Sequence, residues 1–193
     1  MGLVQPIATR RSATGIPTGK LAVWWLIGSE IVIFGGVLVS YIILRHYHAD
    51  WTEEAAATNV WLGGLNTFVL LTSSLFAVLA HYYMEKRNDA KKASMYLWLT
   101  VVGALTFLVV KSFEWTHEIQ HGYVMTKSLF WGFYYTAAGI HGLHVIAGAV
   151  IMGIIAIQIR QGKHYNRVEL IGLYWHFVDI VWIFLFPLLY IAK

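Results

Sequence analysis

Five long apolar segments constrain this sequence more than any other feature. They cover approximately residues 21–47, 59–84, 93–119, 129–159 and 167–192. A helix needs about 20 mainly apolar residues to cross the hydrocarbon core of a bilayer, so each segment is long enough to span one. Only 12% of the residues are charged, whereas soluble domains contain about a quarter. The sequence therefore predicts an all-α, polytopic bundle of five transmembrane helices.

The rest of the chain predicts a simple domain organisation. Residues 1–19 contain Ser, Thr, Gly and Pro but no apolar run of their own, so we expect a flexible cytoplasmic tail and not a secretory signal. Residues 20–193 then form a single five-helix transmembrane domain. The chain has no cysteine, which excludes disulfides and thiolate chemistry. We assign its net charge of +4 to loop cations that set topology, and expect no nucleic-acid partner.

Lysine and arginine are distributed unequally between the two sides of the predicted bundle. With five spans, ten of the 14 lie on the side of the N-terminus: Arg10, Arg11, Lys20, Lys86, Arg87, Lys91, Lys92, Arg160, Lys163 and Arg167. Cytoplasmic loops carry the excess of basic residues in membrane proteins. The N-terminus is therefore predicted in the cytoplasm and the C-terminus outside.

Ionisable side chains inside the apolar segments are the positions most relevant to function. Each costs roughly 2.5–3.5 kcal/mol to insert at mid-membrane, so we expect it to be paired or to face a cavity. Three pairs are spaced three residues apart, which places their members on one helix face: Lys111 with Glu114, His141 with His144, and His176 with Asp179. We predict an ion pair for the first, and an ion pair or a shared proton for the last. Fixing of helix register is the alternative role.

Glu30 differs from these pairs because no cation lies three or four residues away. Its partner must come from another helix, a lipid headgroup, water or a proton. Glu30 is therefore expected to be protonated or to lie beside a cavity, in a functional or lipid-contact role. Asn66 is a neutral polar partner in the second span.

Two histidine spacings raise the question of a metal site. His141 and His144 form an HxxH pattern, and two ExxH patterns follow one another between Glu114 and His121. Both ExxH units lie on one stretch at its wet end, so they cannot face each other across a bundle as the ligands of a di-iron site do. We therefore expect this chain to bind neither a metal ion nor haem.

Glycine and proline predict local packing features. Close helix approach is expected at small residues: Gly35, Gly36, Gly63, Gly64, Gly139, Gly142, Gly148 and Gly153. Pro187, near the end of the last span, removes a backbone hydrogen bond and is expected to kink the helix.

Five motifs carry a resemblance to a known family. They are Ser29-Glu30 followed by Phe34, Asn66-Thr67 with Leu71-Thr72-Ser73-Ser74, Phe113-Glu114-Trp115, residues 139–145 (GIHGLHV) with Gly148, and residues 174–182 (YWHFVDIVW). Together they resemble subunit III of cytochrome c and quinol oxidases and the related small subunits linked to nitric-oxide reductases. The resemblance covers nearly all of residues 21–191 and, with five spans, is similar to the short bacterial form.

The resemblance implies an accessory subunit of a proton-pumping terminal oxidase in the bacterial cytoplasmic (inner) membrane. Such a complex reduces oxygen to water in aerobic respiration, with haem and copper held by partner catalytic subunits and none by this chain. Implied partners are oxidase subunit I, the other oxidase subunits and phospholipids bound in a cleft. A larger respiratory supercomplex is a further implied partner. The family's members protect the catalytic subunit during turnover and support proton uptake, and no catalytic residue is expected here.

Particular residues carry this resemblance further. Glu30 matches the family's carbodiimide-reactive carboxylate, and Glu114 and His141 resemble buried polar residues of the cleft region. Lys111 departs from the pattern, because many members have Gln there in a Gln-x-x-Glu motif. A subunit of a quinol oxidase or of the nitric-oxide-reductase branch is therefore the alternative. An autonomous proton-coupled transporter is a further one, although neither an inverted repeat nor interrupted helices support it.

Overall fold

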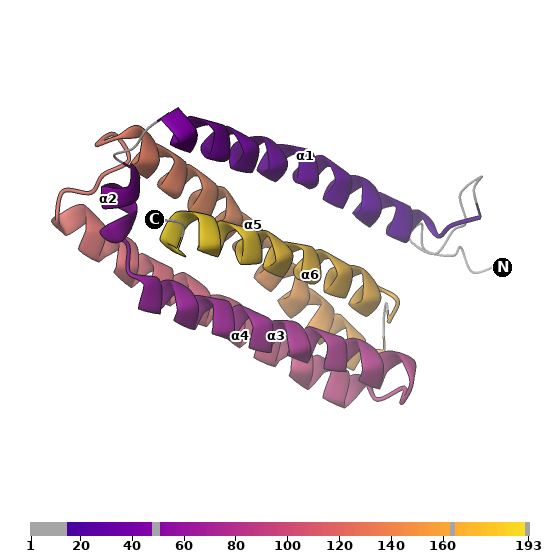
Figure 1. The fold of residues 1–193 in the computed structure, drawn as a ribbon. Helices are drawn as coiled ribbons and strands as arrows, with labels where there is room; N and C mark the ends of the chain where they lie inside the picture. The colour runs from indigo at the N-terminus through magenta and orange to yellow at the C-terminus, as the bar shows by residue number, and fades with distance from the viewer. Residues whose placement is uncertain (1–14, 48–50, 163–164, 192–193) are drawn as a thin grey trace.

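The computed structural model describes residues 15–47, 51–162 and 165–191, and no strand occurs among them. Five long helices are α1 (Thr18–Tyr47), α3 (Val60–Glu85), α4 (Ala90–Gln120), α5 (Leu129–Arg160) and α6 (Arg167–Phe186). A short helix, α2 (Trp51–Ala56), lies between α1 and α3, and a π-helical turn, η2 (Pro187–Ile191), continues α6 (Figure 1).

The predicted five-span architecture is confirmed. Each long helix, with η2 added to α6, is long and apolar enough to cross a membrane. The helix ends agree within a few residues, although α1 already begins at Thr18, inside the predicted tail. Residues 1–14 of that tail, and the predicted end of the last span at Ala192, lie outside the described residues. The side of the membrane on which each end lies stays a prediction.

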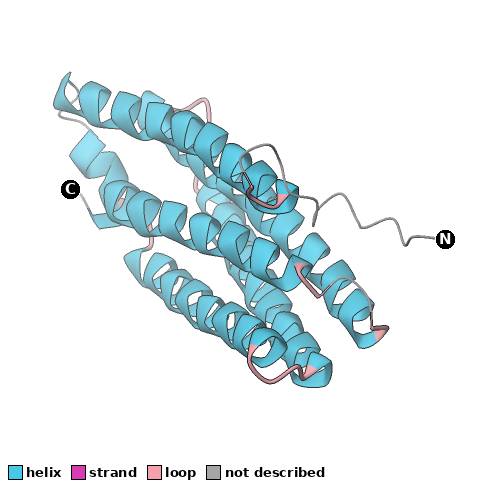
Figure 2. Cartoon of the chain, turned by 90° about the vertical axis from the view of Figure 1, so that its right-hand side faces the viewer, coloured by secondary structure: helices cyan, strands magenta, loops and turns pink. Residues whose placement is uncertain are grey.

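The helices lie side by side along one common direction (Figures 1 and 2). Helix α3 packs along α4, α4 packs along α5, and α6 contacts both α3 and α5. Helix α1 lies at the edge of the bundle against α6 and α5. The start of α1 and the end of η2 lie at opposite ends of the bundle (Figure 1), as an odd number of spans requires.

Polar side chains fix where three of the helices begin. Asn59 accepts hydrogen bonds from the backbone N–H groups of Trp61 and Leu62 at the start of α3. Asp89 caps α4 and Ser128 caps α5 in the same way. These side chains satisfy backbone donors that a helix leaves unpaired in its first turn.

Helix α2 is a structure that the sequence did not indicate, because residues 48–58 read as a polar loop. Trp51 in α2 is buried, and its ring lies 5.0 Å from that of Tyr41 and 6.1 Å from that of Phe130. A buried indole anchors the segment, and α2 therefore closes one end of the bundle between α1 and α5.

Close helix approach occurs at some of the predicted glycines. A Cβ atom at Gly63 would lie 2.7 Å from the ring of Phe186, and one at Gly148 would lie 2.9 Å from the ring of Trp175. Three others have open space in this chain, where an added Cβ atom would contact no other helix of it: Gly35, Gly36 and Gly142. Pro187 marks the change from α-helix to the π-helical turn.

Helix α1 is tied to the bundle near both of its ends. Lys20 Nζ lies 2.6 Å from Glu169 Oε1 at the start of α6. Towards the other end, the hydroxyl of Tyr41 donates a hydrogen bond of 2.9 Å to the carbonyl of Leu188 in η2. Between these two ties, α1 borders an apolar groove.

Candidate functional site

Glu30 meets a partner from another helix, as its isolation in the sequence required. Its Oε2 lies 3.1 Å from Nε2 of His144 on α5. Both side chains are largely buried, with 14% of Glu30 and 20% of His144 exposed. The contact lacks the alignment of a hydrogen bond, so we treat it as a close electrostatic contact.

The other nitrogen of His144 forms a hydrogen bond within α5. Nδ1 lies 2.9 Å from the carbonyl oxygen of Ile140, and a carbonyl can only accept, so Nδ1 carries a hydrogen. Nε2 is therefore the ring nitrogen that faces Glu30.

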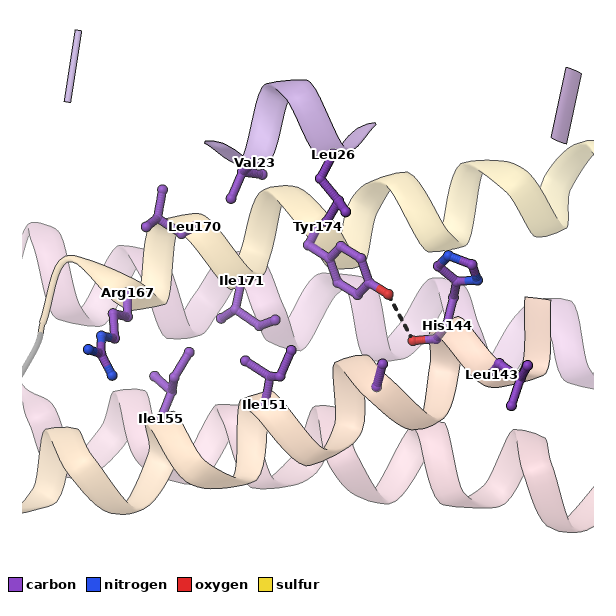
Figure 3. A pocket seen from close by; sticks show the side chains of 11 residues that line it. Val23, Leu26, Leu143, His144, Ile151, Ile155, Arg167, Leu170, Ile171 and Tyr174 are labelled. Atoms are coloured by element: carbon purple, nitrogen blue, oxygen red, sulfur yellow. Dashed lines mark hydrogen bonds between the residues drawn. The ribbon is translucent and has the colours of Figure 1, made fainter. Parts of the chain in front are cut away.

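His144 of this pair lines an apolar groove between α1, α5 and α6 (Figure 3). The groove has a volume of about 610 Å³. Arg167 lines one end of the groove and His144 lies towards the other (Figure 3). Its walls are mostly aliphatic: Val23, Leu26, Leu143, Ala147, Ile151, Ile155, Leu170 and Ile171. Tyr174 completes the lining and donates to the carbonyl of His144 over 3.2 Å.

A second polar cluster is buried near the end of α4. The predicted ion pair is present, with Lys111 Nζ 3.0 Å from Glu114 Oε2. Lys111 also donates to the hydroxyls of Tyr134, at 2.9 Å, and of Tyr190, at 2.6 Å. Its three N–H groups are thereby all used, which satisfies an ammonium that is only 5% exposed.

Glu118 belongs to this cluster, although its sequence position suggested the wet end of a helix. It is 3% exposed, and the hydroxyl of Tyr134 lies 2.9 Å from its Oε1. The spacing of four from Glu114 and seven from Lys111 places all three on one face of α4, which was the signal available. Nothing in the sequence indicated Tyr134 or Tyr190, because they come from α5 and η2.

The predicted pairing of His176 with Asp179 was wrong. Nδ1 of His176 lies 2.7 Å from the hydroxyl of Ser74 on α3 instead. Asp179 is 3% exposed, and neither of its oxygens has a hydrogen-bond partner among the described residues. The spacing of three residues brings His176 and Asp179 to one side of α6, but the packing of α6 against α3 makes Ser74 the partner of His176.

His141 and Asn66 are buried in the bundle core. The ring of His141 stacks on Trp182 with centroids 5.2 Å apart, and meets the edge of Phe107 at 5.5 Å. The side-chain polar atoms of His141 and Asn66 have no hydrogen-bond partner within the described part of the chain. His141 and His144 thus contact different partners, and their HxxH spacing does not create a joint site.

No group of three or more His, Cys, Asp or Glu side chains is placed to hold a metal ion within residues 15–47, 51–162 and 165–191. The ionisable groups of the spans are instead buried in pairs and clusters between helices.

These features define a class: a multi-pass helical membrane protein with buried acid–base groups between its helices. Within that class, the chain belongs to the cytochrome c oxidase subunit III family, whose model matches residues 20–193. It is accordingly a subunit of a haem–copper oxidase complex, which is an oxidoreductase.

Curated relatives agree with this assignment. The chain is 33% identical to "Cytochrome c oxidase subunit 3" of Bacillus sp. (strain PS3), over 96% of this chain and 92% of the relative. It is 34% identical to the protein of the same name from Thermostichus vulcanus, over 84% and 82%. It is also 34% identical to "Probable quinol oxidase subunit 3" of Staphylococcus aureus (strain USA300), over 89% and 87%.

Proposed function

We propose that this chain is the haem-free accessory subunit of a proton-pumping terminal oxidase in a bacterial inner membrane. The catalytic subunits hold haem and copper and reduce oxygen, whereas this chain packs against subunit I, binds phospholipid and supports proton uptake. Its own residues carry out no redox chemistry. The observation that carries the proposal is the Glu30–His144 pair beside an apolar groove, because it joins a proton-holding group to a lipid-sized space.

The groove suits a phospholipid. Its aliphatic walls match an acyl chain, and burial of each CH₂ group stabilises the complex by about 0.8 kcal/mol. Arg167 lies at one end and uses Nη1 to bond Gln158 over 2.9 Å. The guanidinium has four further N–H groups, which can bind a lipid phosphate. On the predicted topology this end faces the cytoplasm.

The Glu30–His144 pair supports a proton-holding role. The two groups share one proton between them, and they lie at the middle of α1 and α5, where an unpaired charge is costly. A group that gains or loses one proton here can exchange it with an uptake route in a neighbouring subunit. The Nδ1 hydrogen bond to Ile140 keeps the ring aimed at Glu30 in either protonation state.

Replacement of Glu30 tests this role in the whole oxidase complex. Glu30→Gln removes the shared proton, so we expect a shorter catalytic lifetime during turnover and loss of labelling by a carbodiimide. The measurement is oxygen consumption over successive turnovers, with proton release into vesicles. Glu85→Gln is the matched control, since Glu85 lies at the exposed end of α3. Equal lifetimes and pumping ratios for Glu30→Gln and wild type would sink the proton role.

Co-purification tests the subunit assignment itself. Affinity purification of this chain in a mild detergent is expected to recover haem-containing subunits at a fixed stoichiometry. Recovery of a haem-free monomer that moves protons across liposomes would favour the transporter alternative instead.

The electron donor is a separate question, and both cytochrome c oxidase and quinol oxidase subunits occur among the relatives. Oxygen consumption by the purified complex with reduced cytochrome c or with a quinol distinguishes them. Nitric oxide reduction in the same preparation tests the remaining branch of the superfamily.

A further inference from the structure

The cluster of Lys111, Glu114 and Glu118 gathers two carboxylates around one ammonium. Lys111 donates to Oε2 of Glu114, and the hydroxyl of Tyr134 lies within hydrogen-bond distance of Oε1 of both carboxylates. Tyr190 accepts from Lys111, and its hydroxyl oxygen also lies 3.0 Å from that of Tyr134. Oε2 of Glu118 is buried without any partner in the described chain.

The two carboxylates are also close together. Oε1 of Glu114 lies 3.1 Å from the hydroxyl oxygen of Tyr134, and Oε1 of Glu118 lies 2.9 Å from the same atom. The two carboxylate oxygens are therefore at most about 6 Å apart. Both side chains are at least 97% buried, and like charges at this distance disfavour joint ionisation. One ammonium, that of Lys111, balances only one of them.

Lys111 is the one lysine or arginine in contact with the pair among the described residues. Helix α5 contributes Tyr134 and Tyr135, and the hydroxyl of Tyr135 donates to the carbonyl of Tyr123. Element η2 contributes Tyr190. On α4 the one other ionisable neighbour that borders the same space is His117. One proton on the carboxylate pair completes the charge balance.

A cavity connects this pair with the end of the bundle. It has a volume of about 500 Å³ and is bordered by Glu114, His117 and Glu118 on one side. The other side is formed by residues 57–62, where α2 turns into α3. The space is large enough for several water molecules, and the polar groups in its wall can bond them.

We infer that Glu114 and Glu118 form a proton-binding site that holds one proton between them, with Lys111 as its fixed counter-charge. The cavity beside the α2–α3 turn is its route to water. The site lies near the end of α4, away from the Arg167 end of the groove, and is independent of the proton held by Glu30. On the predicted topology it exchanges with the outer aqueous phase, the side towards which an oxidase releases protons.

Infrared spectroscopy of the intact oxidase complex in lipid nanodiscs tests this inference. A protonated carboxyl group has a distinct C=O stretching band, and wild type minus variant difference spectra at neutral pH isolate it. Glu118→Gln leaves Glu114 paired with Lys111 and ionised, so one protonated-carboxyl band is expected to disappear. Glu114→Gln is expected to remove one band as well, because Lys111 then pairs with Glu118. Glu85→Gln, at the exposed end of α3, is the control and changes no such band.

The route to water has its own readout. Transfer of the complex into D₂O is expected to shift the band within minutes, because the cavity admits solvent. The haem-to-protein ratio of each variant shows that the complex is intact. An unchanged protonated-carboxyl band in both glutamine variants overturns the inference, since both carboxylates would then be ionised. A band that fails to shift in D₂O overturns it too, because a proton site without exchange cannot take up or release a proton.

Discussion

The Lys111 ammonium provides the sharpest test of how this bundle is stabilised. Lys111→Met keeps an unbranched apolar stem but removes the charge and all three donors. Lys111 lies nine residues before the end of α4 at Gln120, or about 13 Å at 1.5 Å per residue, and only 5% of it is exposed. Removal of one partner of a buried ion pair costs about 3–5 kcal/mol, because the other charge stays uncompensated.

The lower part of this range is expected at neutral pH. Glu114 can take up a proton once Lys111 is gone, and a neutral carboxyl group is less costly to bury than a carboxylate. A loss of about 3 kcal/mol lowers the folding equilibrium constant by roughly a hundredfold, since each 1.4 kcal/mol is a factor of ten. The double variant Lys111→Met with Glu114→Gln removes both charges and is expected to recover most of this loss.

The assay is reversible unfolding of the full chain in mixed micelles with increasing SDS, followed by tryptophan fluorescence. Lys92→Met is the matched control. Its partner Asp89 lies 3.9 Å away and 56% of the Lys92 side chain is exposed, so the change should stay within about 0.5 kcal/mol. If Lys111→Met unfolds within 1 kcal/mol of wild type, roughly the size of an ordinary substitution, the buried pair is not a significant source of stability and the reasoning fails.

Three further predictions concern packing. Gly148→Ala places a methyl group against the buried ring of Trp175 and should destabilise the chain by about 1–3 kcal/mol in the same unfolding assay, whereas Gly36→Ala meets open space and should not. Tyr41→Phe loses its bond to a carbonyl of η2, so amide exchange in α1 should quicken by an amount equivalent to about 0.5–1.5 kcal/mol; unchanged exchange would show that the tie is ineffective. Ile151→Trp fills the groove and should lower the lipid retained by the purified complex, measured by mass spectrometry, relative to Ile157→Trp on another face of α5.

The spans were predictable because hydropathy and length determine them almost alone. An apolar run of the right length has few alternatives in a bilayer, since every backbone group must be satisfied within the segment. The Lys111–Glu114 pair was predictable for a similar reason, because spacing on one helix sets their distance. Helix α2 was missed because one buried tryptophan anchors it, and a polar six-residue helix has too little periodicity to recognise.

Partners from other helices were not predictable from spacing. Glu30 clearly needed a partner, but the choice of His144 depends on how α1 docks against α5. His176 had an acidic neighbour three residues away and nevertheless bonds Ser74, because α6 packs against α3 on that side. The sequence placed Glu118 at the water-facing end of a span, whereas in the structure Tyr134 and the α2–α3 turn bury it. Tertiary packing decides such contacts, and a single sequence does not contain that packing explicitly.

The two ties of α1 have a consequence for ligand capture. Helix α1 is held by the ion pair of Lys20 near one end and by the hydrogen bond of Tyr41 near the other. It cannot move inwards and close the groove without breaking one of these two contacts. The apolar groove is thus preorganised, and a ligand does not have to separate the helices in order to bind. The conformational entropy of ordering α1 is lost during folding and not on ligand binding. A bound molecule can therefore exchange quickly while the dimensions of the groove stay constant.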